Sequence, residues 1–155
     1  MIGPVFVDTN VFVYLHDDSE PEKKTRADEW ISLLVRDRSG RVSFQVLQEL
    51  YSTLTSKRRL NVDVAEARII VREVAVWQPV AVDLAMLNRA WVLQDRFSLS
   101  WWDALIIAAA QTCECKVLLT EDLQDGQEFG TVQVVNPFAT PDRTPEEILT
   151  VCEEI

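Results

Sequence analysis

The chain has 155 residues, of which 48% are hydrophobic and 26% are charged, a balance typical of folded globular proteins and not of disordered ones. Its formal net charge of −10 argues against broad electrostatic attraction to nucleic acid, so a nucleic-acid function requires local basic residues or a metal ion that reverses the sign of the site. Only four glycines occur and no apolar run is long enough to span a bilayer, so we expect neither a glycine-rich nucleotide-binding loop nor a membrane partner.

The cysteine content and the N-terminus predict a protein of the reducing cytoplasm. The three cysteines form an odd set, and the single histidine, His16, leaves too few ligands for a structural zinc site. The N-terminal segment MIGPVFVDTN has neither the basic region nor the long apolar run of an export signal. We therefore expect a cytoplasmic location.

Short apolar strands and amphipathic helices are expected to alternate in the first half of the chain. The segment PVFVD, residues 4–8, predicts a buried strand that ends at Asp8, and a helix begins beside it near Thr9 or Asn10. The elements expected after these are a helix over 21–38, a strand over 41–44, a helix over 45–59 and a helix over 63–77.

The same alternation continues in the second half. The expected elements are a strand over 79–82, a helix over 84–95 capped by Asp83, a helix over 98–111, a strand over 116–120, an acidic loop over 121–130, a strand over 132–136 and a helix over 145–153. Short apolar strands separated by helices are typical of a parallel sheet covered on both faces. The sequence therefore predicts a single α/β domain, residues 1–155, with a central, mainly parallel sheet of about five short strands.

Four carboxylates stand where such a sheet collects its ligands, beyond the carboxyl ends of the strands. Asp8 ends the first strand, and Glu49 lies on the helix that follows the second. Asp103 opens the helix that leads to the strand over 116–120, and Asp122 follows that strand. Each acid also has an ordinary interpretation, as a helix cap, a solvated side chain or, with Ser100, part of a capping box. Because all four fall at strand ends and helix starts, a shared acidic site is the better interpretation.

The chemistry of crowded carboxylates points to a metal cofactor. Neighbouring carboxylates repel one another, and a hard divalent cation removes that repulsion. Mg²⁺ and Mn²⁺ prefer oxygen ligands and bind phosphate together with a few carboxylates. Such a cation lets an acidic protein receive a polyanion and supports hydrolysis of a phosphodiester bond. The sequence thus predicts Mg²⁺ or Mn²⁺ as the cofactor.

The segments that carry these acids resemble those of PIN-domain ribonucleases and, more narrowly, of the VapC toxins of bacterial toxin–antitoxin pairs. The matching segments are VFVDTNVFVY, LQEL, WWDALIIAAA and LLTEDLQDG, in the family's order and within residues 5–126. The resemblance implies a PIN-like three-layer α/β/α fold. It also implies a Mg²⁺- or Mn²⁺-dependent endoribonuclease that hydrolyses phosphodiester bonds in single-stranded regions of RNA.

The resemblance assigns roles to individual residues as well. It implies that the catalytic residues and metal ligands are Asp8, Glu49, Asp103 and Asp122. Asn10 and Thr120 match polar residues that orient the metal ligands through hydrogen bonds. Because Glu121 and Asp125 lie in the same motif as Asp122, replacement of Asp122 by either of them as a ligand stays open.

Partners and alternatives follow from the same resemblance. It implies an RNA substrate, a cognate antitoxin protein and a homodimer. The main alternative is a catalytically inactive PIN-like module that binds RNA or protein, and the presence of all four acids speaks against it. A haloacid-dehalogenase-like phosphatase would carry an aspartate where this chain has Asn10.

Basic and aromatic side chains complete the candidate set. Lys57, Arg58 and Arg59 are candidates for contact with RNA phosphates, although an ordinary solvated surface is the simpler interpretation. Trp101 and Trp102 are expected to be packing anchors rather than base-stacking platforms.

Overall fold

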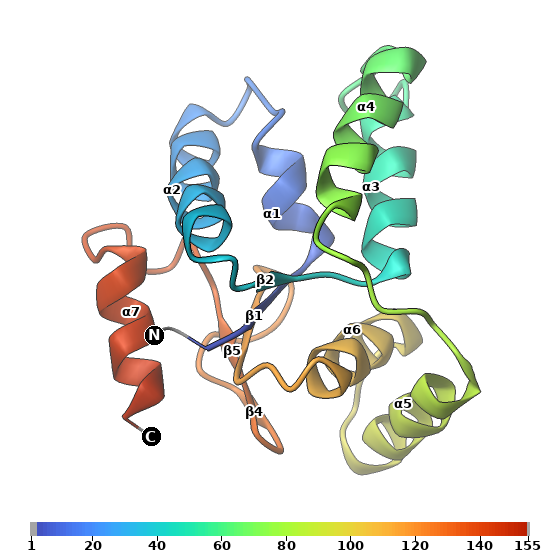
Figure 1. Ribbon diagram of the computed structural model, residues 1–155, viewed down its shortest axis with the longest axis vertical. Coiled ribbons are helices and arrows are strands. Elements are labelled where there is room, and N and C mark those ends of the chain that lie inside the picture. Colours follow the sequence, from blue (N-terminus) through green and yellow to red (C-terminus); the bar gives the residue numbers. More distant parts are fainter. Residues whose placement is uncertain (1–2, 155) are drawn as a thin grey trace.

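The computed structural model describes residues 3–154 and contains a five-stranded sheet in the order β2-β1-β3-β5-β4 (Figure 1). Strands β1 (Val5–Val7), β2 (Gly40–Arg41), β3 (Val117–Leu119) and β5 (Val132–Val135) run parallel. Strand β4 (Glu128–Phe129) pairs antiparallel with β5 at one edge. The predicted central, mainly parallel sheet is therefore confirmed.

Helices cover both faces of this sheet, which gives the three-layer α/β/α arrangement expected (Figure 1). On one side lie α1 (Thr9–Tyr14), α2 (Pro21–Asp37), α3 (Phe44–Thr55) and α4 (Val64–Ala75). On the other lie α5 (Leu84–Arg96) and α6 (Trp101–Thr112), and α7 (Pro145–Glu153) packs beside α2. No helix within residues 3–154 is both long and apolar enough to cross a bilayer.

Helix α6 contains a continuous run of buried residues directly after Asp103. Ser100 begins it, because its hydroxyl oxygen accepts a hydrogen bond from the Asp103 backbone N–H at 3.1 Å. Every residue from Ala104 to Ala110 is buried, as expected for a helix that is apolar on all sides and lies between a sheet and a second helix. The buried run fixes the helix start, and with it the position of Asp103.

The structure corrects three of the predicted boundaries. The strand expected over 79–82 is wrong, since this segment forms only an isolated bridge between Val80 and Ser43. The sheet takes its fifth strand from β4, inside the region expected to be an acidic loop, where a hairpin closes through Gly130 at φ 63°. Helix α3 ends at Thr55, so residues 57–59 lie in the turn after the helix and not on it.

A buried arginine ties the segment after β5 to α2. Arg26 is only 6% exposed, and its guanidinium donates hydrogen bonds to the backbone carbonyls of Pro137 at 2.8 Å, Thr140 at 3.0 Å and Arg143 at 2.7 Å. It also forms an ion pair with Glu29 at 2.9 Å. One side chain thus satisfies carbonyl groups that no strand or helix pairs.

Replacement of Arg26 by alanine should lower the free energy of unfolding by about 3 kcal/mol, because the change removes three charge-assisted hydrogen bonds and leaves the buried carbonyl of Pro137 unpaired. Urea unfolding followed by circular dichroism measures the difference. Arg36→Ala is the matched control, since Arg36 lies on the same helix but pairs with Glu146 at the exposed surface. Equal stability of the two variants would contradict the structural role given to Arg26.

Candidate active site

Asp8 stands at the carboxyl end of β1 and caps the helix that follows. Its Oδ1 accepts a hydrogen bond from the Thr9 backbone N–H at 2.7 Å, and its backbone N–H donates to the carbonyl of Leu119 in the neighbouring strand at 3.0 Å. The side chain is 6% exposed. The cap and the buried acidic site, which the sequence presented as alternatives, are properties of the same carboxylate.

The environment of Asp8 disfavours its ionised form. Removal from water raises the pKa of the Asp8 carboxyl group to about 7, although hydrogen bonds from Thr120 and Thr9 work in the opposite direction. The nearby charges of Asp122 and Glu49 also contribute to this raised pKa. The acids predicted from three separate segments therefore lie close enough to act on one another.

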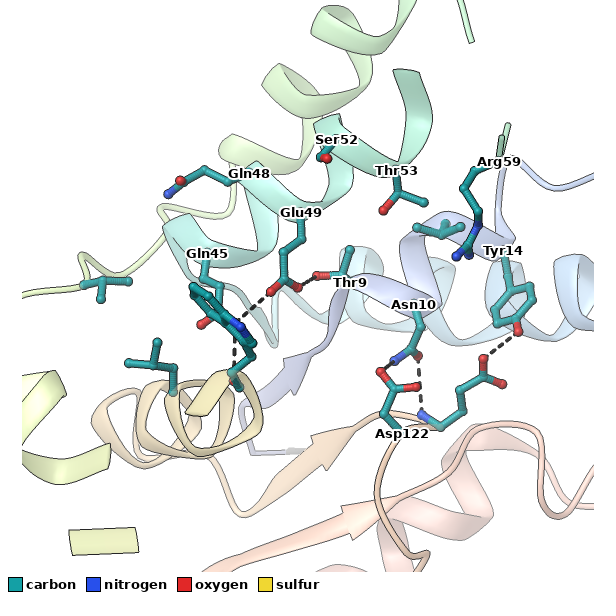
Figure 2. A pocket seen from close by; sticks show the side chains of 15 residues that line it. Thr9, Asn10, Tyr14, Gln45, Gln48, Glu49, Ser52, Thr53, Arg59 and Asp122 are labelled. Carbon is teal, nitrogen blue, oxygen red and sulfur yellow. Dashed lines mark hydrogen bonds between the residues drawn. The ribbon is translucent and has the colours of Figure 1, made fainter. Parts of the chain in front are cut away.

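Asn10 and Thr120 link the ends of β1 and β3. The Thr120 hydroxyl donates to Oδ2 of Asp8 at 2.8 Å. The Asn10 amide lies within hydrogen-bonding distance of three oxygens, those of Asp8 at 3.3 Å, Thr120 at 3.0 Å and Asp122 at 3.2 Å. Figure 2 shows the side chain of Asn10 directed at Asp122. Both residues therefore contact the acids beside which the resemblance places them.

Glu49 projects from α3 toward the start of α1 (Figure 2). Its Oε2 accepts a hydrogen bond from the Thr9 hydroxyl at 2.8 Å, and its Oε1 accepts one from the Gln45 amide at 2.8 Å. The Glu49 carboxylate is thus fixed by two hydrogen bonds and is not a freely solvated side chain. Thr9 and Gln45 were missed in the sequence, although Gln45 is four residues before Glu49 on the same helix face.

The three acids of the loop after β3, Glu121, Asp122 and Asp125, lie in different surroundings. Asp122 lies at the edge of the site, where partial removal from water raises its pKa, the Asn10 amide lowers it, and Glu121, Asp103 and Glu49 raise it. The Glu121 carboxylate instead accepts hydrogen bonds from the Tyr14 hydroxyl at 2.5 Å and Lys23 Nζ at 3.0 Å.

Asp125 points to another part of the same loop. Its Oδ1 accepts a hydrogen bond from the Asn136 backbone N–H at 2.8 Å. The carboxylates of Glu121 and Asp125 therefore form hydrogen bonds away from Asp8. Of the three acids in this loop, the geometry favours Asp122 as the candidate metal ligand.

Asp103 lies in the first turn of α6, close enough for its charge to raise the pKa of Asp122. Within residues 3–154, its carboxylate has no hydrogen bond to the Ser100 backbone, so only half of the predicted capping box is present. The Asp103 carboxylate is therefore available to bind a metal ion.

A cavity of about 900 Å³ opens beside these acids. Its lining includes Glu49, Asp122 and a polar stripe of α3, with side chains from Gln45, Gln48, Ser52 and Thr53 (Figure 2). Of the predicted basic cluster, Arg59 contributes to the lining, whereas Lys57 and Arg58 do not. Trp102 also lines it and is 62% exposed, so the expectation of a packing anchor is wrong for this tryptophan.

The donor set fits a hard divalent cation in its chemistry. The candidate ligands are carboxylate oxygens. Burial is the main cause of the raised pKa values of Asp8 and Asp122, and repulsion between the acids, which a cation would relieve, adds to it. As the side chains stand in residues 3–154, no three acidic, histidine or cysteine groups converge on a common point. Binding of an ion therefore requires carboxylates to exchange their present hydrogen bonds for the ion.

Comparison of the sequence with known protein families identifies its family. The sequence model of a family described as the PIN domain matches residues 5–124, a segment that includes β1, β3 and all of the candidate acids. No curated protein matches the chain.

Proposed function

The chain belongs to the PIN domain family, whose fold is generally that of a nuclease, and from this premise we propose that it is a Mg²⁺- or Mn²⁺-dependent endoribonuclease. It hydrolyses phosphodiester bonds in single-stranded regions of RNA. The observation that supports this most strongly is the buried Asp8 carboxylate, whose pKa of about 7 reflects both burial and the neighbouring charges of Asp122 and Glu49.

Asp8, Glu49, Asp103 and Asp122 are the residues that would hold the cation. A bound divalent cation supplies charge that stabilises the phosphate oxygens and activates water for attack on phosphorus. The chain itself supplies rigid placement: Thr120 and Thr9 fix the Asp8 carboxylate, and Gln45 fixes that of Glu49. The cavity beside them receives the RNA strand.

The test is cleavage of a mixed single-stranded RNA by the purified protein, with millimolar Mg²⁺, with Mn²⁺, and with EDTA. We expect cleavage with either metal and none with EDTA, because the carboxylates alone provide no positive charge to stabilise the reacting phosphate. Cleavage that persists in EDTA would refute the metal mechanism. Binding of RNA without cleavage under any condition would favour the alternative of a catalytically inactive PIN-like binding module.

Arg59 should contribute more to RNA binding than the two basic residues before it. Arg59 lines the cavity, whereas Lys57 and Arg58 are exposed outside it. Arg59→Ala should weaken RNA binding to a similar extent for all sequences and reduce the slope of log affinity against log salt by about 1, as expected for loss of one phosphate contact. Arg58→Ala is the matched control; an equal effect of both changes would show a diffuse surface attraction instead.

We extend the proposal to the biological role on the basis of the resemblance to VapC toxins. In this role the protein acts in the cytoplasm as the toxin of a toxin–antitoxin pair, forms a homodimer and is inhibited by a cognate antitoxin. Expression of the wild-type chain in a bacterial host should arrest growth, while expression of the Asp8→Asn variant should not. Normal growth with the wild-type protein at the same level would count against the toxin role.

A further inference from the structure

Trp102 presents a large aromatic surface to the cavity. It is 62% exposed although it occupies the first turn of α6, a helix whose next residues from Ala104 to Ala110 are all buried. The buried part of the helix holds the backbone of Trp102 in place. The adjacent Trp101 has a packing partner, since its ring stacks on that of Trp91 with centroids 6.1 Å apart. In the part of the chain described, residues 3–154, Trp102 has no aromatic partner of its own.

The backbone of Trp102 lies beside the candidate acids. Its neighbour in the chain is Asp103, and its backbone carbonyl accepts a hydrogen bond from the Gln45 amide at 3.3 Å. The same amide donates to Glu49 at 2.8 Å. Trp102 also lines the same cavity as Glu49 and Asp122, so a group stacked on its indole lies in the cavity with two of the four carboxylates.

Trp102 and Arg59 mark opposite ends of the polar stripe on α3. The Gln45 end of this helix contacts Trp102, and Arg59 follows the other end, beyond Thr55. Figure 2 shows Gln45 and Arg59 on opposite sides of Gln48, Ser52 and Thr53. The helix between Gln45 and Thr55 is about 15 Å long at 1.5 Å per residue, which is enough for a short run of nucleotides. The cavity thus has an aromatic surface at one end and the Arg59 guanidinium at the other, with Glu49 and neutral hydrogen-bonding side chains of α3 between them.

We propose that Trp102 is a substrate-binding residue that stacks on one nucleobase of the RNA and so fixes which phosphate lies at the acids. The inference rests on the proposed ribonuclease function. Aromatic stacking favours every base to a similar degree, because each base has a π-face. Trp102 therefore sets the register of cleavage, and base identity is read elsewhere if at all.

The experiment measures binding of a fluorescently labelled single-stranded RNA in EDTA, so that binding is separated from cleavage. Trp102→Ala should weaken binding roughly 10-fold to 100-fold, the effect of losing one base–aromatic stack, and Trp102→Phe should restore most of it. Trp91→Ala is the matched control, because Trp91 is exposed on α5 but does not line the cavity.

A scan with abasic nucleotides gives a result that a purely structural role cannot produce. One abasic position should weaken binding to the wild-type protein as much as Trp102→Ala does, and the same RNA should bind the Trp102→Ala variant without further loss. Losses that add at every position, or unchanged binding in Trp102→Ala, would overturn the inference. So would a change in oligomeric state alone, which would make Trp102 a contact between protein chains.

The same assays separate this inference from the proposed function. If the wild-type protein binds RNA with the predicted abasic pattern but cuts no RNA with Mg²⁺ or Mn²⁺, the nuclease proposal fails and the stacking role stands. If the protein cuts RNA but Trp102→Ala binds and cuts like wild type at the same phosphates, the stacking role fails and the nuclease proposal stands. If the wild-type protein binds no single-stranded RNA, the inference fails.

Discussion

Replacement of Asp8 by asparagine should lower metal-dependent RNA cleavage by about three orders of magnitude or more, because in the proposed mechanism the variant loses a charged oxygen ligand of the metal. The fold should persist, since the asparagine oxygen still accepts the Thr9 N–H and the Thr120 hydroxyl can accept from the new amide. Initial rates of cleavage with saturating Mg²⁺ measure the effect. Asp103→Asn should behave in the same way.

Asp125→Asn provides a matched control for these two variants. Asp125 belongs to the acidic loop after β3, and its amide counterpart still accepts a hydrogen bond from the Asn136 N–H. This variant should cleave RNA at the wild-type rate. A rate for Asp8→Asn that equals that of Asp125→Asn would remove Asp8 from the site.

Stability without divalent ions should fall as the pH rises from about 4 to about 7. The pKa of Asp8 is about 7 in the folded protein and close to 3.8 when the chain is unfolded, so in this window the folded state keeps a proton that the unfolded state has released. The stabilisation is complete below pH 4 and is lost as the pH passes 7. The loss is on the order of 4 kcal/mol for a group this deeply buried.

Urea unfolding in EDTA at a series of pH values measures this dependence. Asp8→Asn should remove most of it and be more stable than the wild type at pH 8, with a smaller slope of the same sign from Asp122, whose pKa is also raised. Millimolar Mg²⁺ should stabilise the wild type more at pH 8 than at pH 5, because the ion binds ionised carboxylates. A wild-type protein with no slope between pH 4 and 7 would contradict the burial of Asp8.

The parts of the fold that the sequence predicts well are those with strong local signals. The apolar run before Asp8 and the one that follows Lys116 both form buried strands. The segment around Val80 carries a similar local pattern but makes only one bridge, because strand formation depends on a partner that the local sequence does not specify. Strand β4 has a weak local pattern and was therefore missed. Its two residues pair with β5 because the turn at Gly130 brings the two segments together.

The candidate site shows the same division. Asp8 and Asn10 are two residues apart, so their relation is visible in the sequence. The engagement of Glu121 was not predictable, because Tyr14 and Lys23 approach it from helices about 100 residues earlier in the chain. The orientation of Trp102 was equally hidden, since the sequence gives two adjacent tryptophans and only the packing of α5 against α6 shows which one is covered.

Strand β5 lies outside the segment that matches the PIN domain family, yet it is a central part of the sheet. The match to the PIN domain ends at residue 124, yet β5 lies between β3 and β4 in the sheet. A fragment cut at residue 124 would expose the backbone edge of β3 and deprive Arg26 of its three carbonyl acceptors. Such a fragment retains every candidate acid but should aggregate through its open strand. Fragments for expression or domain fusion should therefore be bounded by the sheet and not by the limits of the family match.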